Sequence, residues 1–114
     1  MARLVVLINA PHRLSVAEAE AWLREETGAL RALDSVSDLA VLQLRSPSEL
    51  WSKQRDWMIE IRCDGPDAAT MIVGHGAWLS LLADFQQLGL HPEVALVDET
   101  SKPAGNAVGL SQRA

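Results

Sequence analysis

The sequence predicts an α+β domain whose elements follow the order strand, helix, strand, strand, helix, strand. Three stretches support this prediction: an apolar strand at residues 3–9, an alternating strand at residues 57–63, and a helix, stop and strand within residues 77–97. The chain has 114 residues, of which 48% are hydrophobic, enough for one domain with its own core. We expect this domain to span residues 1–99 and to be followed by a flexible C-terminal tail, residues 100–114, rich in small and polar side chains.

Local signals mark the first strand and the first helix. Residues 4–8 are all apolar, which favours a strand that is covered on both faces. Ser15 and Glu18 form an S-x-x-E capping box, a typical helix start, and Gly28 supplies a stop. Residues 29–37 fit either a further helical turn or the start of the next strand. Four apolar residues mark the side of the helix that we expect to be buried: Val16, Ala19, Leu23 and Leu30.

Two strands follow in the middle of the chain. Residues 38–45 are largely apolar, and a polar connection leads from them to residues 57–63. In this second strand, Trp57, Ile59, Ile61 and Cys63 share one face, and Met58, Glu60 and Arg62 share the other. A turn at residues 64–67 leads into a helical region that Gly74-His75-Gly76 should kink or break.

Residues 77–97 are predicted to form an amphipathic helix, a sharp stop and a short buried strand. Gly89 occupies the position of a left-handed C′ residue, so that Leu90 becomes the C″ residue of a Schellman cap. Pro92 prevents the helix from resuming, and the apolar residues 94–97 form the last strand. One stripe of the helix contains Trp78, Leu81, Leu82, Phe85 and Leu88.

This order of elements is the split β-α-β, or ferredoxin-like, arrangement. It predicts a four-stranded antiparallel sheet with both helices on one face, and right-handed crossovers select the spatial order 4-1-3-2. The first two strands offer apolar residues to both faces, yet one chain has no element left to cover the second face. A second copy of the same sheet is the simplest cover, so we expect a homodimer.

The chain resembles the dimeric α/β-barrel superfamily over residues 3–98. The resemblance rests on the element order and on the segments DWMIEIR and AWLSLLADFQQLGLHPEVALVD. This superfamily includes antibiotic-biosynthesis monooxygenases, muconolactone-isomerase-like proteins and EthD-like proteins. Its members are often small enzymes of aromatic or polyketide metabolism: some work without metal or organic cofactor, some bind haem, and others are regulatory or have no known activity. The resemblance implies a dimeric barrel with a pocket for an apolar ligand.

The composition argues against several functional classes. The net charge is −5 and the ten basic residues are scattered, which argues against a nucleic-acid partner. No apolar run approaches the roughly 20 residues of a membrane span, and the chain start is typical of a strand rather than a signal peptide. Cys63 is the single cysteine, so an intrachain disulfide is excluded and a cytoplasmic location is the default. The histidines and Cys63 lack metal-ligand spacing, so we expect no metal and no cofactor.

The predicted topology gathers polar residues at the end of the sheet where the first two strands end and the last two begin. His12 and His91 are the best candidates for proton transfer, because histidine titrates near neutral pH, although both also fit ordinary loop positions. We expect Asn9, Arg45 and Trp51 to contact the substrate. The full group at this end is Asn9, His12, Arg45, Trp51, Arg55, Asp56 and His91.

Further candidates lie within the strands and helices. Glu60 and Arg62 share one face of a central strand, where they form either a mutual or intersubunit ion pair or a substrate contact with Glu60 as a catalytic base. His75, between two glycines, either admits a ligand or separates two short helices. Trp57 and Trp78 either line a pocket for a flat aromatic substrate or belong to the core.

These features favour a cofactor-independent enzyme, either a cyclase, an isomerase or an oxygenase, acting on a hydrophobic aromatic or polyketide-like small molecule in bacterial secondary metabolism. Several monooxygenases of the superfamily use a tyrosine near the substrate, and this chain has none, which weakens the oxygenase assignment. The alternative is a non-catalytic small-molecule-binding or regulatory module built on the same barrel.

Overall fold

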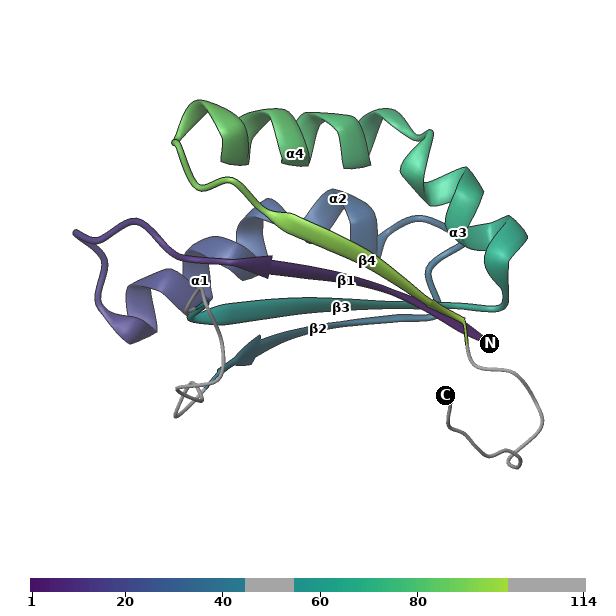
Figure 1. Cartoon of the computed structure of the whole chain (residues 1–114), viewed down its shortest axis with the longest axis horizontal. Helices are drawn as coiled ribbons and strands as arrows, with labels where there is room; N and C mark the ends of the chain where they lie inside the picture. The colour runs from purple at the N-terminus through teal and green to yellow at the C-terminus, as the bar shows by residue number, and fades with distance from the viewer. Residues whose placement is uncertain (45–54, 99–114) are drawn as a thin grey trace, which may run out of the picture.

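The computed structural model describes residues 1–44 and 55–98, which form one antiparallel sheet with helices (Figure 1). The sheet has the strand order β2-β3-β1-β4. The predicted α+β, ferredoxin-like fold and its spatial order are therefore confirmed. Each of the two helical regions is divided into two helices, the second of them at the predicted break. The elements are β1 (Ala2–Ile8), α1 (Val16–Glu26), α2 (Gly28–Arg31), β2 (Asp38–Gln43), β3 (Trp57–Cys63), α3 (Pro66–Val73), α4 (Gly76–Gln87) and β4 (Glu93–Asp98).

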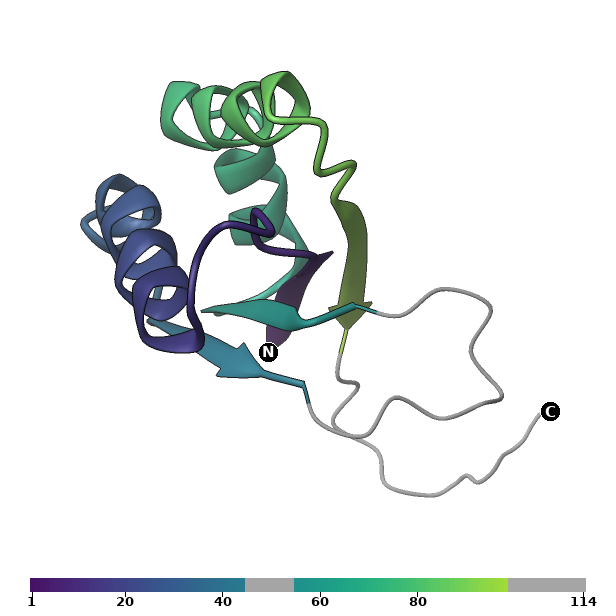
Figure 2. The ribbon, with the colours of Figure 1, turned by 90° about the vertical axis from the view of Figure 1, so that its left-hand side faces the viewer.

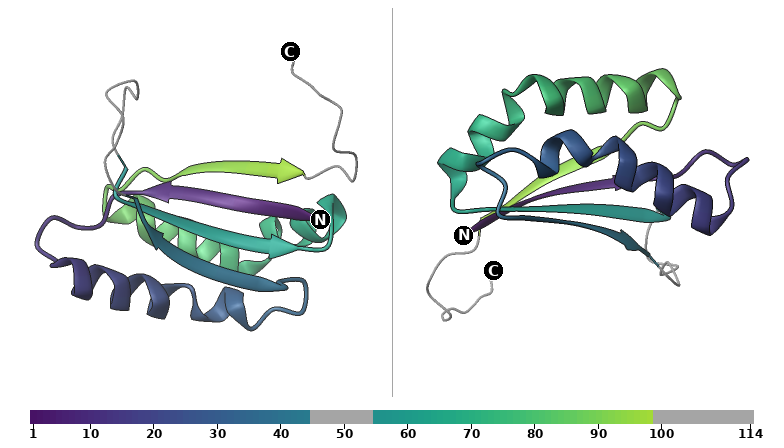
Figure 3. Two further views of the ribbon diagram at one scale, coloured as in Figure 1. Left: turned by 90° about the horizontal axis from the view of Figure 1, so that it is seen from below. Right: turned by 180° about the vertical axis from the view of Figure 1, so that it is seen from behind.

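All four helices lie on one face of the sheet, as the end-on view in Figure 2 shows. No described element covers the other, open face: seen from below, the strands lie in front of the green helices α3 and α4 (Figure 3, left). Among the described helices, none alone is long and apolar enough to span a membrane. Together, α3 and α4 reach that length and apolar composition, but the pair is bent by 60°.

The core lies between the sheet and the helices. Alternate residues of β1 and β3 point into it, because successive side chains of a strand point to opposite faces. Leu4 pairs with Ile61 and Val6 pairs with Ile59, and all four are almost fully buried. The other residues of β1 are half-buried on the opposite face, so in the single chain the expected cover of that second face is absent among the described residues and is left to a second copy.

The predicted capping box starts α1. The backbone N–H of Glu18 donates to Ser15 Oγ at 3.2 Å, and the backbone N–H of Ser15 donates to Glu18 Oε1 at 2.8 Å. Hydrogen bonds to the Glu18 carboxylate, first from the backbone N–H of Ser15 and then from its side chain, lower the pKa of Glu18 because they stabilise its ionised form. The helix ends at Glu26, before the predicted stop at Gly28, which instead begins the single turn of α2. The ambiguous segment therefore contains a helical turn.

Helices α3 and α4 are separated at the predicted break around His75. The Nδ1 atom of His75 accepts a hydrogen bond from the backbone N–H of Ala77 at 3.0 Å, so His75 is the N-cap of α4. At the other end, Gly89 has φ +74° and Leu90 N–H donates to the carbonyl of Phe85 at 3.0 Å. The bond from Leu90 to Phe85 is the one that joins the C″ and C3 residues of a Schellman motif, which confirms the predicted cap.

Strand β4 is exposed along its whole length, so the prediction of a buried last strand is wrong. It is an edge strand, and α3 leaves a groove of about 260 Å³ beside Val94 and Leu96 instead of covering them. Leu88 and Val16 are also exposed rather than buried, because each lies at the end of its helix and beyond the packed part of the stripe.

Candidate functional site

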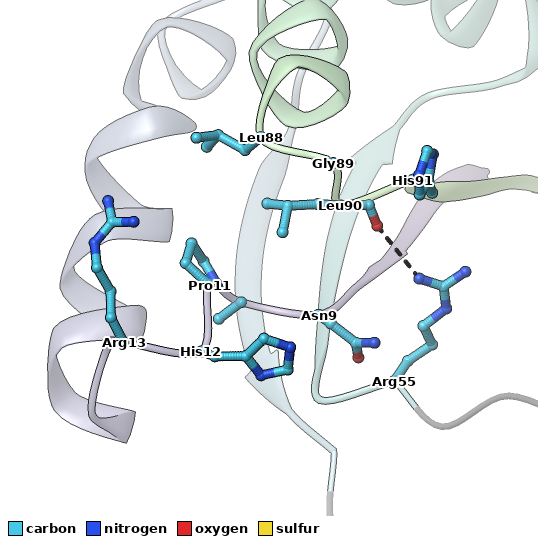
Figure 4. A pocket seen from close by; sticks show the side chains of 10 residues that line it. Asn9, Pro11, His12, Arg13, Arg55, Leu88, Gly89, Leu90 and His91 are labelled. Carbon is cyan, nitrogen blue, oxygen red and sulfur yellow. Dashed lines mark hydrogen bonds between the residues drawn. The ribbon is translucent and has the colours of Figure 1, made fainter.

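A cavity of about 650 Å³ lies at the end of the sheet where β1 ends and β4 begins (Figure 4). One wall is the loop between β1 and α1, and the opposite wall is the turn between α4 and β4. Arg55, just before β3, lies between the two walls. The lining residues are Asn9, Ala10, Pro11, His12, Arg13, Arg55, Leu88, Gly89, Leu90 and His91.

Two hydrogen bonds, each donated by a backbone N–H group, fix the first wall. Asn9 Oδ1 accepts from the backbone N–H of Asp56 at 2.9 Å, which ties the end of β1 to the start of β3. Leu14 N–H donates to the carbonyl of Pro11 at 3.1 Å and closes a turn over His12. In Figure 4 the His12 ring points toward Asn9. His12 thus reaches the cavity from a loop that is tied down at both ends.

The second wall is the Schellman turn and the residue that follows it. After Gly89 the chain passes through Leu90 to His91, which has φ +46°. A left-handed conformation costs a residue with a Cβ atom roughly 1–2 kcal/mol, and such outliers cluster at functional sites. His91 is therefore held in an unfavourable conformation where it lines the cavity.

Arg55 connects this turn to β4. Its Nη1 donates to the carbonyl of Leu90 at 3.5 Å, drawn as a dashed line in Figure 4, and its Nε donates to Glu93 Oε1 at 3.1 Å. The side chain is only 8% exposed, so its charge lies largely out of bulk solvent. Arg55 therefore brings a positive charge to the cavity and fixes the turn that carries His91.

A smaller cavity, of about 290 Å³, adjoins the first. The two share Ala10, Pro11 and His12, so this loop segment is a common wall. Trp57, one of the predicted substrate contacts, lines the smaller cavity with Ser15.

The structure brings some of the predicted site residues together and separates others. Asn9, His12 and His91 share the larger cavity. His75 lies at the start of α4, where its ring caps the helix, and Trp78 lies buried one turn further on, at 2% exposure. Arg45, Trp51 and residues 100–114 lie outside the described residues.

Glu60 and Arg62 lie on the open face of the sheet, away from this cavity. Glu60 Oε2 accepts from Arg3 Nη1 at 2.9 Å, and Glu60 Oε1 lies 3.4 Å from Arg62 Nε. The mutual ion pair, one of the two alternatives for these residues, is therefore present. Glu60 is well covered for a residue on an open face, with a side chain 13% exposed.

The sequence did not predict that Arg13 lines the cavity. It placed Arg55 at this end of the sheet but assigned it no role. Both flank expected site residues: Arg13 follows His12, and Arg55 precedes the strand whose start was placed at this end. The available signal was one arginine in each of two segments that the topology brings to the same end of the sheet.

The described residues contain no group of three or more His, Cys, Asp or Glu side chains that could hold a metal ion. Cys63 is fully buried, and its Sγ donates to the carbonyl of Ala2 at 3.5 Å. Burial raises the pKa of this thiol, with a smaller contribution from Asp64, so the reactive thiolate is disfavoured.

Comparison with known proteins gives similarity at the level of structure alone. No family model matches the chain, and no curated protein matches it by sequence. An Arabidopsis thaliana protein, At3g17210, superposes with a TM-score of 0.68 at 15% identity, covering 93% of this chain and 100% of that protein. A DABB-family protein from Mesorhizobium loti gives 0.65 at 16% identity, with 89% and 96% covered.

A third similar structure is SnoaB of Streptomyces nogalater, described as a cofactor-independent oxygenase, with a TM-score of 0.62 at 12% identity and coverage of 92% and 97%. Two further similar structures are dimeric ferredoxin-like proteins of unknown function, from Thermobifida fusca and Bacteroides fragilis. The structural superpositions establish the fold. Sequence identities this low leave the reaction open. The chain therefore has the ferredoxin-like fold that these structures share, as its element order predicted.

Proposed function

We propose that this chain is a cofactor-independent enzyme that acts on a hydrophobic, aromatic or polyketide-like small molecule bound in the cavity between His12 and His91. The observation that carries the proposal is the placement of two imidazoles, from separate loops, on the walls of one cavity of about 650 Å³. That volume lies within the range of small-molecule sites, about 300–1,000 Å³.

The chemistry assigned to the site is proton transfer. One imidazole removes a proton from an acidic C–H or O–H group of the substrate, and the other returns a proton at a second position or stabilises the anion that forms. Such a step is common to cyclases, isomerases and cofactor-free oxygenases. Similarity to SnoaB supports the class, since that protein is described as a cofactor-independent oxygenase.

The active form in this proposal is a homodimer that pairs the open faces of two sheets. This face carries half-buried apolar residues, including Val5, Leu7 and Met58, around the ion-paired Glu60. Pairing would bury the apolar residues and keep the carboxylate matched to its arginines. Sedimentation equilibrium at micromolar concentration should then give twice the 12.4 kDa chain mass, and a 12.4 kDa species would refute this part.

The catalytic step can be tested with anthrone, a tricyclic aromatic ketone with an acidic methylene group. We expect the protein to accelerate deuterium exchange at that methylene in D₂O, and His12→Gln and His91→Gln each to lower the rate by about 100-fold. Arg24→Gln, on the exposed face of α1, is the control and should exchange at the wild-type rate. Oxygen uptake measured in parallel separates an oxygenase from an isomerase or cyclase.

A non-catalytic binding or regulatory module is the second candidate. It is favoured by one observation: within the described residues, no carboxylate hydrogen-bonds the ring of His12 or His91, as an orienting partner of a catalytic histidine does. Anthrone that binds without accelerated exchange would support this candidate over the enzyme.

A further inference from the structure

We propose that the cavity binds an organic anion, a carboxylate attached to an apolar ring system, and that Arg55 is the residue that holds the carboxylate. This inference rests on the proposed function and defines its substrate class. A neutral aromatic compound should then bind this site more weakly than a carboxylate of the same shape.

The charge of the cavity wall is the first argument. Arg13 and Arg55 both line the cavity, and both guanidinium groups are permanently charged. The described lining residues include no aspartate and no glutamate, although the chain as a whole has 15 acidic and 10 basic residues. A positively lined cavity in an acidic protein selects negatively charged ligands and accelerates their entry.

The hydrogen bonds of Arg55 are the second argument. A guanidinium has five N–H donors in a planar fork that matches a carboxylate. In the described part of the chain, Arg55 uses its Nε toward Glu93 and one Nη1 hydrogen toward Leu90, which leaves donors for a ligand. Because the side chain is 8% exposed, an ionic hydrogen bond there is weakened little by water.

Asn9 adds a neutral donor at the same place. Its Oδ1 accepts from the backbone of Asp56, so the amide orientation is fixed and the NH₂ group remains as the donor. Arg55 and Asn9 flank the start of β3 and both line the cavity. A charged fork beside an amide donor suits two carboxylate oxygens.

The apolar lining distinguishes an organic anion from an inorganic one. Pro11, Leu88 and Leu90 line the same cavity, and Figure 4 shows Pro11 and Leu90 facing the space above Asn9. Hydrocarbon surface gives no stabilisation to phosphate, but it stabilises an aromatic ring by roughly 25 cal/mol per Å² of area removed from water. We therefore assign the site to a carboxylate carried on a ring.

Calorimetric titration with naphthalene-2-carboxylate, naphthalene-2-carboxamide and inorganic phosphate tests this assignment on the wild-type chain. The carboxylate should bind at least tenfold more tightly than the carboxamide of the same shape, and phosphate should bind more weakly than the carboxylate. Equal affinity for the two naphthalene compounds would overturn this inference and leave the proposed function standing. Binding of neither would overturn both, and preferential binding of phosphate would overturn the organic assignment.

Two variants test the role of Arg55. Arg55→Gln should weaken carboxylate binding by tenfold or more and leave carboxamide binding nearly unchanged. Glu93→Gln removes the competing carboxylate and should bind the naphthoate at least as tightly as the wild type. If Arg55 acted only by holding β4 through Glu93, the two variants would weaken binding alike, which would overturn its assignment. Arg24→Gln controls for the loss of one positive charge.

Discussion

The two ends of α4 each carry a histidine, and the structure uses the two residues in opposite ways. His75 precedes the helix in an ordinary extended conformation and accepts a hydrogen bond from Ala77, so one ring nitrogen is occupied by the fold. His91 follows the helix with φ +46° and lines a cavity. The first residue stabilises the backbone through its ring. The second costs the backbone energy to hold its ring in place, which is the pattern expected of a functional side chain.

The largest expected effect on stability comes from Phe85, which packs the C-terminal end of α4 into the core. Phe85 is fully buried, and the centroid of its ring lies 5.8 Å from that of Trp22. Its backbone carbonyl accepts the hydrogen bond from Leu90 that closes the turn before His91. We expect Phe85→Ala to lower the free energy of unfolding by about 3–5 kcal/mol, measured in urea. Leu88→Ala, at an exposed position of the same end, should cost less than about 0.5 kcal/mol. Equal losses would show that the core does not hold this end.

The N-terminal end should respond to the loss of its cap. His75→Ala removes the acceptor for the Ala77 amide and should destabilise the protein by about 1 kcal/mol, with faster hydrogen exchange in the first turn of α4. His75→Asn supplies another good N-cap and should recover most of this loss. If Asn and Ala behave alike, the hydrogen bond to Ala77 contributes nothing to stability.

Substitution of His91, after the C-terminal end of α4, should change stability in the opposite direction. His91→Gly removes the penalty of φ +46° and should raise the free energy of unfolding by up to about 1 kcal/mol, while deuterium exchange of anthrone falls. His91→Ala keeps a Cβ atom and should therefore lose the same activity without gaining the stability. A destabilised Gly variant would mean that the imidazole stabilises the turn, which would remove the contrast between the two histidines.

The smallest expected effect is electrostatic and belongs to the same end of α4. Burial raises the pKa of Glu26, and Asp84 in the last turns of α4 raises it further. Because the folded state then holds the proton more tightly than the unfolded chain does, this group's contribution to stability falls as the pH rises from about 4.5 through the raised pKa.

Glu26→Gln removes this pH-dependent loss of stability, because glutamine does not ionise. The variant should be more stable than the wild type at pH 7, by about 0.5 kcal/mol or less, and should match it near pH 4, as measured by thermal unfolding at both pH values. Asp84→Asn should act in the same direction, because a negative charge near a helix C-terminus is unfavourable. A wild-type advantage at pH 7 would contradict this explanation.

Features that depend on neighbouring residues could be predicted from the sequence. The capping box of Ser15 and Glu18 and the left-handed Gly89 each follow from side chains a few positions apart. The exposure of β4 could not be predicted, because it depends on where α3 and α4 pack, and an apolar strand has the same pattern whether a helix covers it or not. Residues 94–97 therefore looked buried.

The candidate site divides in the same way. Antiparallel order alone brings the end of β1 and the start of β4 together, so the proximity of His12 and His91 was predictable. The function of Arg55 was not, because it depends on one side chain reaching the carbonyl of Leu90, 35 positions away in the sequence. The cap role of His75 was hidden for a different reason: its partner is only two positions away, but serine, threonine, aspartate and asparagine are the residues that usually signal an N-cap.

The loop segment Ala10–His12 separates two cavities of about 650 and 290 Å³. A ligand that displaced this loop from one side would also reshape the other cavity, and thermodynamic linkage would make any effect on affinity equal in both directions.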